Sequence, residues 1–324
     1  MNKSTEMPLQ ERNDRFILFP IQHNDLWDLY KKVESHFWTA EEIDLSPDLK
    51  DWENILSKEE KSCIKQLLSF FSSTEQALNE NILLNFMKDA ESSEARYFYG
   101  FQMMTENIHT ETFSLLLDAY IKDSSEKNDL FRSTQALASI SKKAEWSMKH
   151  LHNGSLPERL VAFAAAEGIF FLGSTCSTHW LRKRGLMPGL TNAVELISRD
   201  EKLHSDFSIL LCSKLENKLS KEKIAEIISE AVTLERNFVR EAIPAKIIGL
   251  DPATICQHIE FHADKLLLSF GCEKIYNSTD PFFIKENNLS QSNKKISELR
   301  AAEYRKAGVR SEATEEIFSS DEEF

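Results

Sequence analysis

The sequence predicts an all-α fold built from long helices, and three observations support this prediction. Glycine and proline, which most often interrupt helices, number only 9 and 8 in 324 residues, about 5% against a usual share of roughly 12%. Apolar residues recur every three or four positions through most of the chain, which is the spacing of a helix that buries one face. No stretch alternates apolar and polar residues for long enough to indicate a strand.

Capping residues and turns place the ends of these helices. Ser57 and Glu60 form a capping box, and Pro157 and Pro252 suit the first turn of a helix. Residues 185–189, Gly-Leu-Met-Pro-Gly, are the clearest turn. Together these signals predict helices over residues 24–36, 57–88, 93–120, 125–151, 157–184, 191–217, 220–244 and 251–270.

The two ends of the chain differ from this helical part. Residues 1–14 are polar and are expected to form a mobile N-terminal arm, before a helical domain over residues 15–285. Residues 286–324 are rich in Ser, Asn, Glu and Lys, which is typical of a flexible tail. Residues 318–324 place two aromatic residues around acidic ones, and this pattern favours a docking peptide for another protein.

Charge and composition exclude several classes of function. The formal net charge of −13 argues against a nucleic-acid partner, because phosphate binding needs a basic surface. The five cysteines lack Cys-x-x-Cys spacing, so we expect reduced thiols in a cytoplasmic protein. The polar first ten residues show no secretory signal. The longest apolar stretch, residues 160–176, is shorter than the about 20 residues that span a membrane, so no membrane contact is expected.

Two Glu-x-x-His pairs are candidate metal ligands. Glu106 and His109 form the first pair, and Glu201 and His204 form the second. Residues three apart share one face of a helix, so each pair can present one oxygen and one nitrogen inward. One such pair occurs readily by chance, and the case therefore depends on the sequence around the pairs.

Two further carboxylates, Glu75 and Glu167, lie 31 and 34 residues upstream of the pairs. Glu167 lies in an apolar run, where an unpaired carboxylate would cost several kcal/mol, so it needs a cation or a proton. Glu75 on its own resembles a solvated helix residue, and only the repeated pattern makes it a candidate. A carboxylate helix followed by a Glu-x-x-His helix, used twice, is typical of a two-metal site in a helical bundle. Oxygen-rich donors with one imidazole per metal favour iron or manganese over zinc.

The chain resembles a known family, the small (beta) subunit of class I ribonucleotide reductase, and most closely its eukaryotic type. The matching stretches lie at residues 37–45, 94–102, 106–109, 161–171, 184–190 and 197–204. The resemblance implies a ferritin-like helical bundle, a homodimer and a dinuclear metal site that uses oxygen to generate an oxidant. It also implies that the oxidant passes to a large (alpha) subunit, which reduces ribonucleotides to deoxyribonucleotides.

The resemblance assigns roles to single residues. The metal ligands that it implies are Glu75, Glu106, His109, Glu167, Glu201 and His204. The radical-transfer route that it implies falls on Trp38, Asp200 and His109, with Tyr304 in the tail. Asp200 can accept a hydrogen bond from the imidazole of His109 and fix its orientation. The C-terminal peptide of the family docks on the large subunit, and residues 318–324 would fill that role.

Two positions depart from the family pattern. Phe113 lies four residues after the first ligand histidine, where the family usually has the radical-bearing tyrosine, and phenylalanine has no O–H to lose. Glu75 replaces the usual aspartate. Both changes resemble a subclass that uses a manganese–iron pair in place of a tyrosyl radical. We therefore expect a Mn/Fe centre activated by oxygen, with Fe/Fe as the alternative.

Two other functions remain as alternatives at this point. The first is a non-catalytic partner that stabilises an active small subunit, and the second is a related two-metal oxidase that acts on a small organic molecule. Phe113 is compatible with both. Six intact candidate ligands argue against an inert partner, since a scaffold has no need of buried carboxylates. Trp38, Asp200, Tyr304 and Phe324 argue against an autonomous oxidase.

Overall fold

The computed structural model describes residues 17–78, 80–90 and 92–282. It does not describe the side chains of residues 74–84. The described residues form helices joined by short connections, and no β-strand occurs among them. The all-α prediction is therefore confirmed.

The described residues up to Thr279 form the first of two compact units. The helices of the described residues lie in the first unit, with the bounds α1 Asn24–Ser35, α2 Ser46–Asn54, α3 Lys58–Leu78, α4 Glu80–Asp89, α5 Ser93–Tyr120, α6 Ser124–Gln135, α7 Ala138–Ser147, α8 Leu156–Ile169, α9 Leu172–Cys176, α10 His179–Arg184, α11 Pro188–Lys214, α12 Lys221–Ala242, α13 Ala245–Ile248 and α14 Pro252–Ser269. A 3₁₀ turn, Ala40–Glu42, precedes α2, and a π-helical turn, Met148–His152, follows α7.

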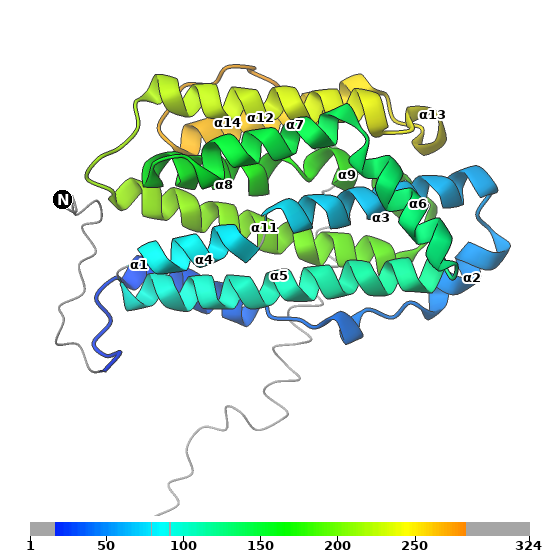
Figure 1. Cartoon of the computed structure of the whole chain (residues 1–324), viewed down its shortest axis with the longest axis horizontal. Helices are drawn as coiled ribbons and strands as arrows, with labels where there is room; N and C mark the ends of the chain where they lie inside the picture. Colours follow the sequence, from blue (N-terminus) through cyan, green and yellow to red (C-terminus); the bar gives the residue numbers. More distant parts are fainter. Residues whose placement is uncertain (1–16, 79, 91, 283–324) are drawn as a thin grey trace, which may run out of the picture. The chain divides into compact units, whose positions relative to one another are not determined.

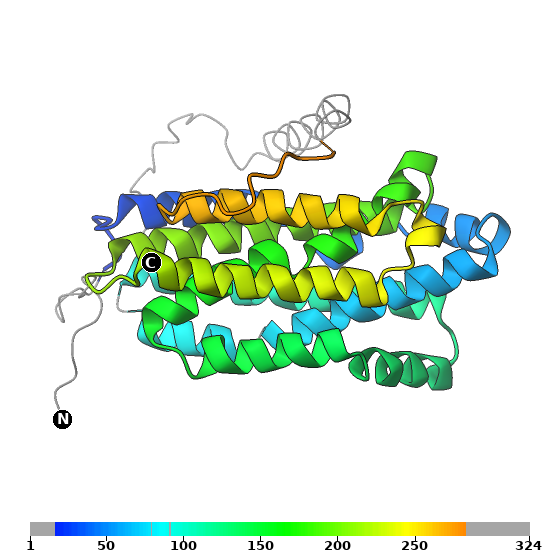
Figure 2. The same ribbon diagram turned by 90° about the horizontal axis from the view of Figure 1, so that it is seen from above.

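Helices α8 and α11 pack against each other in the middle of the first unit (Figure 1). Helices α12 and α14 lie side by side and both pack against α8 (Figure 2). Helix α5 packs against α11, and α1, α3 and α4 cover it from other sides. This arrangement brings together α5, α8 and α11, the helices that carry five of the six candidate ligands.

Helix α8 is the most deeply buried of these three. Every residue from Leu160 to Ala166 is at most 1% exposed, as expected for a helix that is apolar on all sides. The segment Leu156–Cys176 has 21 residues and is long and apolar enough to cross a membrane, so the expectation that it would be too short was wrong. However, 78% of its most apolar window is buried inside the protein. Packing in the core accounts for its hydropathy.

Two helices are interrupted where the sequence predicted continuous ones, over residues 125–151 and 157–184. The first interruption has a clear cause. Leu137 takes extended backbone, and the carboxylate of Glu241 accepts hydrogen bonds from the backbone N–H groups of Ala138 at 3.3 Å and Ser139 at 2.8 Å. A side chain from α12 thus caps the start of α7, a long-range contact that local sequence patterns do not reveal.

Helix α11 begins at Pro188, three residues earlier than predicted, because a side chain from α2 caps it. The carboxylate of Asp48 accepts the backbone N–H of Gly189 at 2.7 Å and that of Leu190 at 2.8 Å. A Cβ atom on Gly189 would lie 2.7 Å from the carbonyl oxygen of Asp44, so the close approach requires glycine. This contact fixes α2 at the start of the helix that carries the second Glu-x-x-His pair.

Candidate metal centre

Five of the six predicted ligands meet in the interior between three helices. They are Glu106 and His109 from α5, Glu167 from α8, and Glu201 and His204 from α11. Each is at most 5% exposed. The three-residue spacing of each Glu-x-x-His pair turns both of its members toward the same side of the helix, and here that side is the interior.

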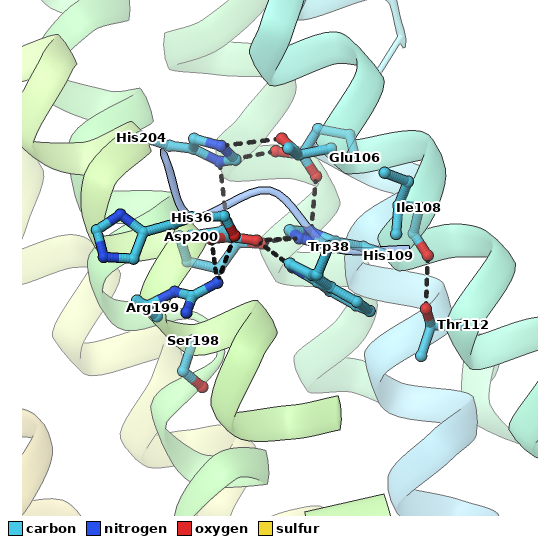
Figure 3. A network of polar contacts seen from close by, with 12 residues as sticks. His36, Trp38, Glu106, Ile108, His109, Thr112, Ser198, Arg199, Asp200 and His204 are labelled. Carbon is cyan, nitrogen blue, oxygen red and sulfur yellow. Dashed lines mark hydrogen bonds and ion pairs between the residues drawn. The ribbon is translucent and has the colours of Figure 1, made fainter. Parts of the chain in front are cut away.

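The imidazoles face carboxylates from the opposite helix. Nδ1 of His204 lies 3.0 Å from Oε1 of Glu106, and Figure 3 shows the two side chains pointing toward each other. The same nitrogen lies 3.6 Å from Oε2 of Glu201 and 3.8 Å from Oε2 of Glu167. Nδ1 of His109 lies 3.0 Å from Oε1 of Glu201 and 3.5 Å from Oε2 of Glu106. The two pairs therefore form one group.

Four of these residues can offer ligand atoms that all lie within 4.8 Å of one another, and we call them the carboxylate–imidazole cluster: Glu106, Glu167, Glu201 and His204. Oε2 of Glu167 and both carboxylate oxygens of Glu201 are buried and, within the described part of the chain, face imidazole nitrogens without forming a hydrogen bond of good geometry. Buried carboxylate oxygens without hydrogen bonds are costly, and a shared cation would satisfy them together. This donor set, oxygen-rich with imidazole, fits iron or manganese.

The electrostatics of the site also favour positive charge. Burial alone would raise the pKa of Glu106, but the imidazoles of His109 and His204 outweigh it and hold that pKa below its usual range. Burial alone would lower the pKa of His204, but Glu106 and Glu201 raise it to about 9. The pKa of His109 is raised well above its usual value against burial, first by Asp200. Metal cations and protons would therefore compete for the same group of side chains.

Asp200 contacts both Trp38 and His109, the two other residues of the predicted radical route that the structure describes. Trp38 donates a hydrogen bond from Nε1 to Oδ2 of Asp200 at 2.7 Å, and Nε2 of His109 lies 3.3 Å from the same oxygen. The rings of Trp38 and His109 are stacked, with centroids 5.9 Å apart. Arg199 lies 3.5 Å from Oδ1 of Asp200 and donates to the backbone oxygen of His36 at 2.8 Å, which holds the segment before Trp38 against α11 (Figure 3).

Phe113 lies one helical turn after His109 on α5 and is 0% exposed. Its ring is stacked on that of Phe71, with centroids 5.0 Å apart and an interplanar angle of 9°. The side chain has no polar atom, so nothing at this position can form a phenoxyl radical. The substitution noted in the sequence therefore lies in a closely packed apolar part of the core.

Thr105 contacts the site and was not identified from the sequence. Its Oγ1 lies 3.3 Å from Nε2 of His204 and donates a hydrogen bond to the backbone oxygen of Gln102 at 2.8 Å. Because the hydroxyl proton is used in that bond, we infer that Oγ1 accepts the Nε2–H of His204. Nδ1 of His204 is then left to face the carboxylates. In the sequence, Thr105 is marked only by its position directly before Glu106, and this position is not part of a recognised motif.

Three predicted site features lie outside what the structure describes. The backbone of Glu75 belongs to α3, but the structure does not describe its side chain. Tyr304 and residues 318–324 lie beyond the described residues. The structure therefore brings together five of the predicted ligands, with Trp38 and Asp200 beside them.

The fold and this site define a class of protein: a helical bundle that can bind metal between carboxylate and imidazole side chains. A family model described as "Ribonucleotide reductase, small chain" matches residues 15–282, which is most of the chain. The chain belongs to this family, as the resemblance of its motifs predicted.

Individual relatives agree with the family model. The protein is 48% identical over 319 residues to a ribonucleoside-diphosphate reductase small chain from Arabidopsis thaliana, and the match covers 96% of each. It is 46% identical to the ribonucleoside-diphosphate reductase subunit M2 of Danio rerio, over 98% of this chain and 82% of that one.

Solved structures show the same likeness. The structure of the Rnr4 homodimer from Saccharomyces cerevisiae matches with a TM-score of 0.79 and 38% identity, over 88% of this chain and 92% of that one. An R2-like ligand-binding oxidase matches with a TM-score of 0.63 at 20% identity, which supports the fold alone. The likenesses confirm the ferritin-like bundle. Membership of the family implies a dinuclear metal centre, and the cluster supplies donors for it.

Proposed function

We propose that this protein is an active small subunit of ribonucleoside-diphosphate reductase that works without a tyrosyl radical at position 113. The observation that carries the proposal is the carboxylate–imidazole cluster, whose buried oxygens need a cation. Phe113, one turn after His109, supports the second part, because it offers no phenol. Intact metal-binding side chains distinguish this function from that of an inert partner subunit.

Six side chains would hold the dinuclear centre in this proposal: Glu75, Glu106, His109, Glu167, Glu201 and His204. When bound and activated by oxygen, that centre supplies the oxidising equivalent for the reductase. The absence of a phenol at position 113 and the glutamate at position 75 both favour a Mn/Fe centre over an Fe/Fe centre.

The residues of the radical route have a defined task. Oxidation of the indole of Trp38 makes its Nε1–H strongly acidic, and Oδ2 of Asp200, 2.7 Å away, is in place to accept that proton. Stacking on His109 holds the indole ring parallel to the imidazole. We propose that Tyr304, in the C-terminal region, continues the route toward the large subunit.

Reconstitution tests the metal assignment. Metal-free protein is loaded with manganese and iron or with iron alone, exposed to oxygen and mixed with the large subunit. We expect more deoxyribonucleotide from the mixed metals, and no phenoxyl signal in electron paramagnetic resonance (EPR). Activity with iron alone and never with the mixed metals would refute the Mn/Fe assignment. A metal-free protein that still enhances a tyrosine-bearing small subunit would instead favour the non-catalytic partner.

Deleting residues 318–324 tests the large subunit as the partner. We propose that this peptide docks there, so its removal should abolish nucleotide reduction and leave metal loading unchanged. The isolated peptide, added to the intact pair of subunits, should inhibit it by competition. An autonomous oxidase would keep its activity after the deletion, which would contradict the proposal.

We further propose a homodimer in which α5 contributes to the contact. Tyr97, Met104 and Leu115 are 44%, 38% and 44% exposed and lie on one face of α5, because they are 7 and 11 positions apart. An exposed apolar stripe of this kind is typical of a protein–protein contact. Leu115→Glu should shift the protein toward monomer in analytical ultracentrifugation, whereas Thr110→Glu, which puts the same charge at an exposed position on another face of α5, should not.

The cysteines support the proposed cytoplasmic location. All five lie in the described part of the chain, all are buried, and none forms a disulfide. Burial raises the pKa of the Cys212 thiol to about 11 and that of Cys63 to about 12. Both thiols therefore stay protonated and unreactive, as expected for packing residues in a reducing compartment.

A further inference from the structure

A buried ion pair lies where helix α8 is interrupted, less than one turn after Glu167. Helix α8 ends at Ile169, and α9 begins at Leu172. Lys143 of α7 and Glu235 of α12 meet beside this break, with Nζ and Oε2 2.5 Å apart and with side chains 7% and 0% exposed. Helix α12 packs against α7, α8 and α9, so the pair connects all the elements around the break.

Each member of the pair also binds the backbone of the break. Nζ of Lys143 donates to the carbonyl oxygen of Phe170 at 3.2 Å, and Oε1 of Glu235 accepts the N–H of Gly173 at 2.8 Å. A Cβ atom at position 173 would lie 2.7 Å from Oε1 of Glu235 and 2.8 Å from Cγ2 of Val239. Only glycine permits this approach. The pair therefore holds the chain on both sides of the interruption.

Stability alone does not explain a pair at this place. Burial lowers the pKa of Lys143 and raises the pKa of Glu235, in each case against the attraction of the partner. The ammonium group lies 4.1 Å from the ring centroid of Phe238, which is a favourable but modest contact. Replacing buried ion pairs by apolar residues is often neutral for stability. The distinguishing property of this pair is its hold on the backbone.

We propose that Lys143 and Glu235 are positioning residues for Glu167, and that they thereby set the metal affinity of the carboxylate–imidazole cluster. Glu167 lies three residues before Phe170, so a shift in the last turn of α8 moves its carboxylate. Oε2 of Glu167 lies 3.8 Å from Nδ1 of His204, and that separation changes with the shift. This inference rests on the proposed metal-binding function.

Three variants separate geometry from stability: Lys143→Met, Glu235→Gln and the double variant. Each single variant leaves one buried charge without its counter-charge, so both should lower the melting temperature. The double variant removes both charges and keeps an acceptor for Gly173, but it has no donor to Phe170. It should regain most of the lost melting temperature and still bind Mn(II) about tenfold more weakly than the wild type, as for other residues that orient ligands.

Mn(II) alone, added to the full-length metal-free protein without oxygen, is the probe. The EPR signal of the free ion reports how much is bound. Asp264→Asn is the matched control, since Asp264 is 1% exposed and accepts the backbone N–H groups of Ile275 and Tyr276 at 3.0 Å each. These bonds do not involve the α8–α9 break. The control should lower the melting temperature without changing the affinity for Mn(II).

Two results would overturn the inference, and they differ in the wild-type measurement. If the wild type binds Mn(II) and the double variant binds it equally well, the pair has a structural role only. If the wild type itself does not bind Mn(II), the proposed metal site is wrong and the inference is wrong with it. Weak binding by the double variant at near-normal stability supports the positioning role.

Discussion

Nε1 of Trp38 lies 2.7 Å from Oδ2 of Asp200, although 162 positions separate the two residues in the sequence. The same oxygen lies 3.3 Å from Nε2 of His109, so one carboxylate atom contacts both an indole and an imidazole. Trp38 belongs to the connection between α1 and α2, and Asp48 of α2 caps the start of α11. The contact therefore depends on two anchors that hold this connection on α11: the cap by Asp48, and the hydrogen bond from Arg199 to the backbone oxygen of His36.

Trp38→Phe should separate radical transfer from metal binding. Phenylalanine keeps an aromatic ring beside His109 but has neither the N–H donor nor the low oxidation potential of indole. We expect nucleotide reduction with the large subunit to fall by two orders of magnitude or more, which corresponds to about 2.7 kcal/mol in the barrier. The metal content after reconstitution should stay at the wild-type level, and metal analysis of the same sample checks this.

Trp52→Phe is the matched control for that substitution. Trp52 lies on α2 and is stacked on Tyr120, with centroids 4.9 Å apart, and it takes no part in the hydrogen bonds of Asp200 described above. This variant should keep most of the reductase activity. If both variants lose activity equally, the loss reflects damage to the segment around α2, and the specific role of Trp38 would be wrong.

The cluster was predictable because it depends on spacing along helices. Glu106 and Glu201 each lie three positions before a histidine, and a helix of regular pitch brings both members of a pair to one face. Glu167 was predictable for another reason, since a carboxylate in an apolar helix needs a counter-charge. These inferences use only distances along one helix, and the same reasoning gave the all-α fold.

The contacts that position the ligands were not predictable in this way. Thr105 reaches His204 across 99 positions, and Glu241 caps α7 across more than 100 positions. Lys143 and Glu235 resemble ordinary charged residues of amphipathic helices, and only the packing of α7 against α12 buries them. Such contacts depend on how the helices pack against one another. The local patterns of a single sequence do not specify this packing.

Thr105→Val should weaken metal binding. Valine keeps the shape of threonine but removes the acceptor for Nε2 of His204, so the imidazole loses the contact that fixes its orientation. We expect the affinity for Mn(II) to fall on the order of 10-fold to 100-fold. Thr112→Val is the control, because Thr112 is equally buried on α5 and its hydroxyl donates to the backbone oxygen of Ile108. Equal affinities in both variants would contradict the role of Thr105.

The metal-free protein should lose stability as the pH rises above neutrality. Although burial lowers the pKa of His204, Glu106 and Glu201 raise it from 6.5 to about 9. Because the folded pKa exceeds the unfolded one, the protonated imidazole stabilises the folded state fully below about pH 6.5. That contribution is lost as the pH rises through about 9. The melting temperature of metal-free protein, measured across this range, should fall steadily.

Two comparisons assign this pH dependence to the site. His204→Gln should lose part of the slope, with His109 supplying the rest, because the pKa of His109 is also raised. Mn(II)-loaded protein should show a flatter profile, since bound metal replaces the protons on the imidazoles. A melting temperature that stays level or rises with pH in the metal-free wild type would contradict this electrostatic account.

Phe113→Tyr should restore a site for a phenoxyl radical. The residue lies one turn after His109, so the new hydroxyl would lie on the face of α5 that bears the cluster. The ring is stacked on Phe71 in a closely packed core, and we expect the added oxygen to cost about 1–3 kcal/mol of stability. After reconstitution with iron and oxygen, EPR should show a sharp phenoxyl signal in the variant and none in the wild type. A phenoxyl signal of equal size in the wild type would mean that another tyrosine is oxidised, and the proposed role of Phe113 would be wrong.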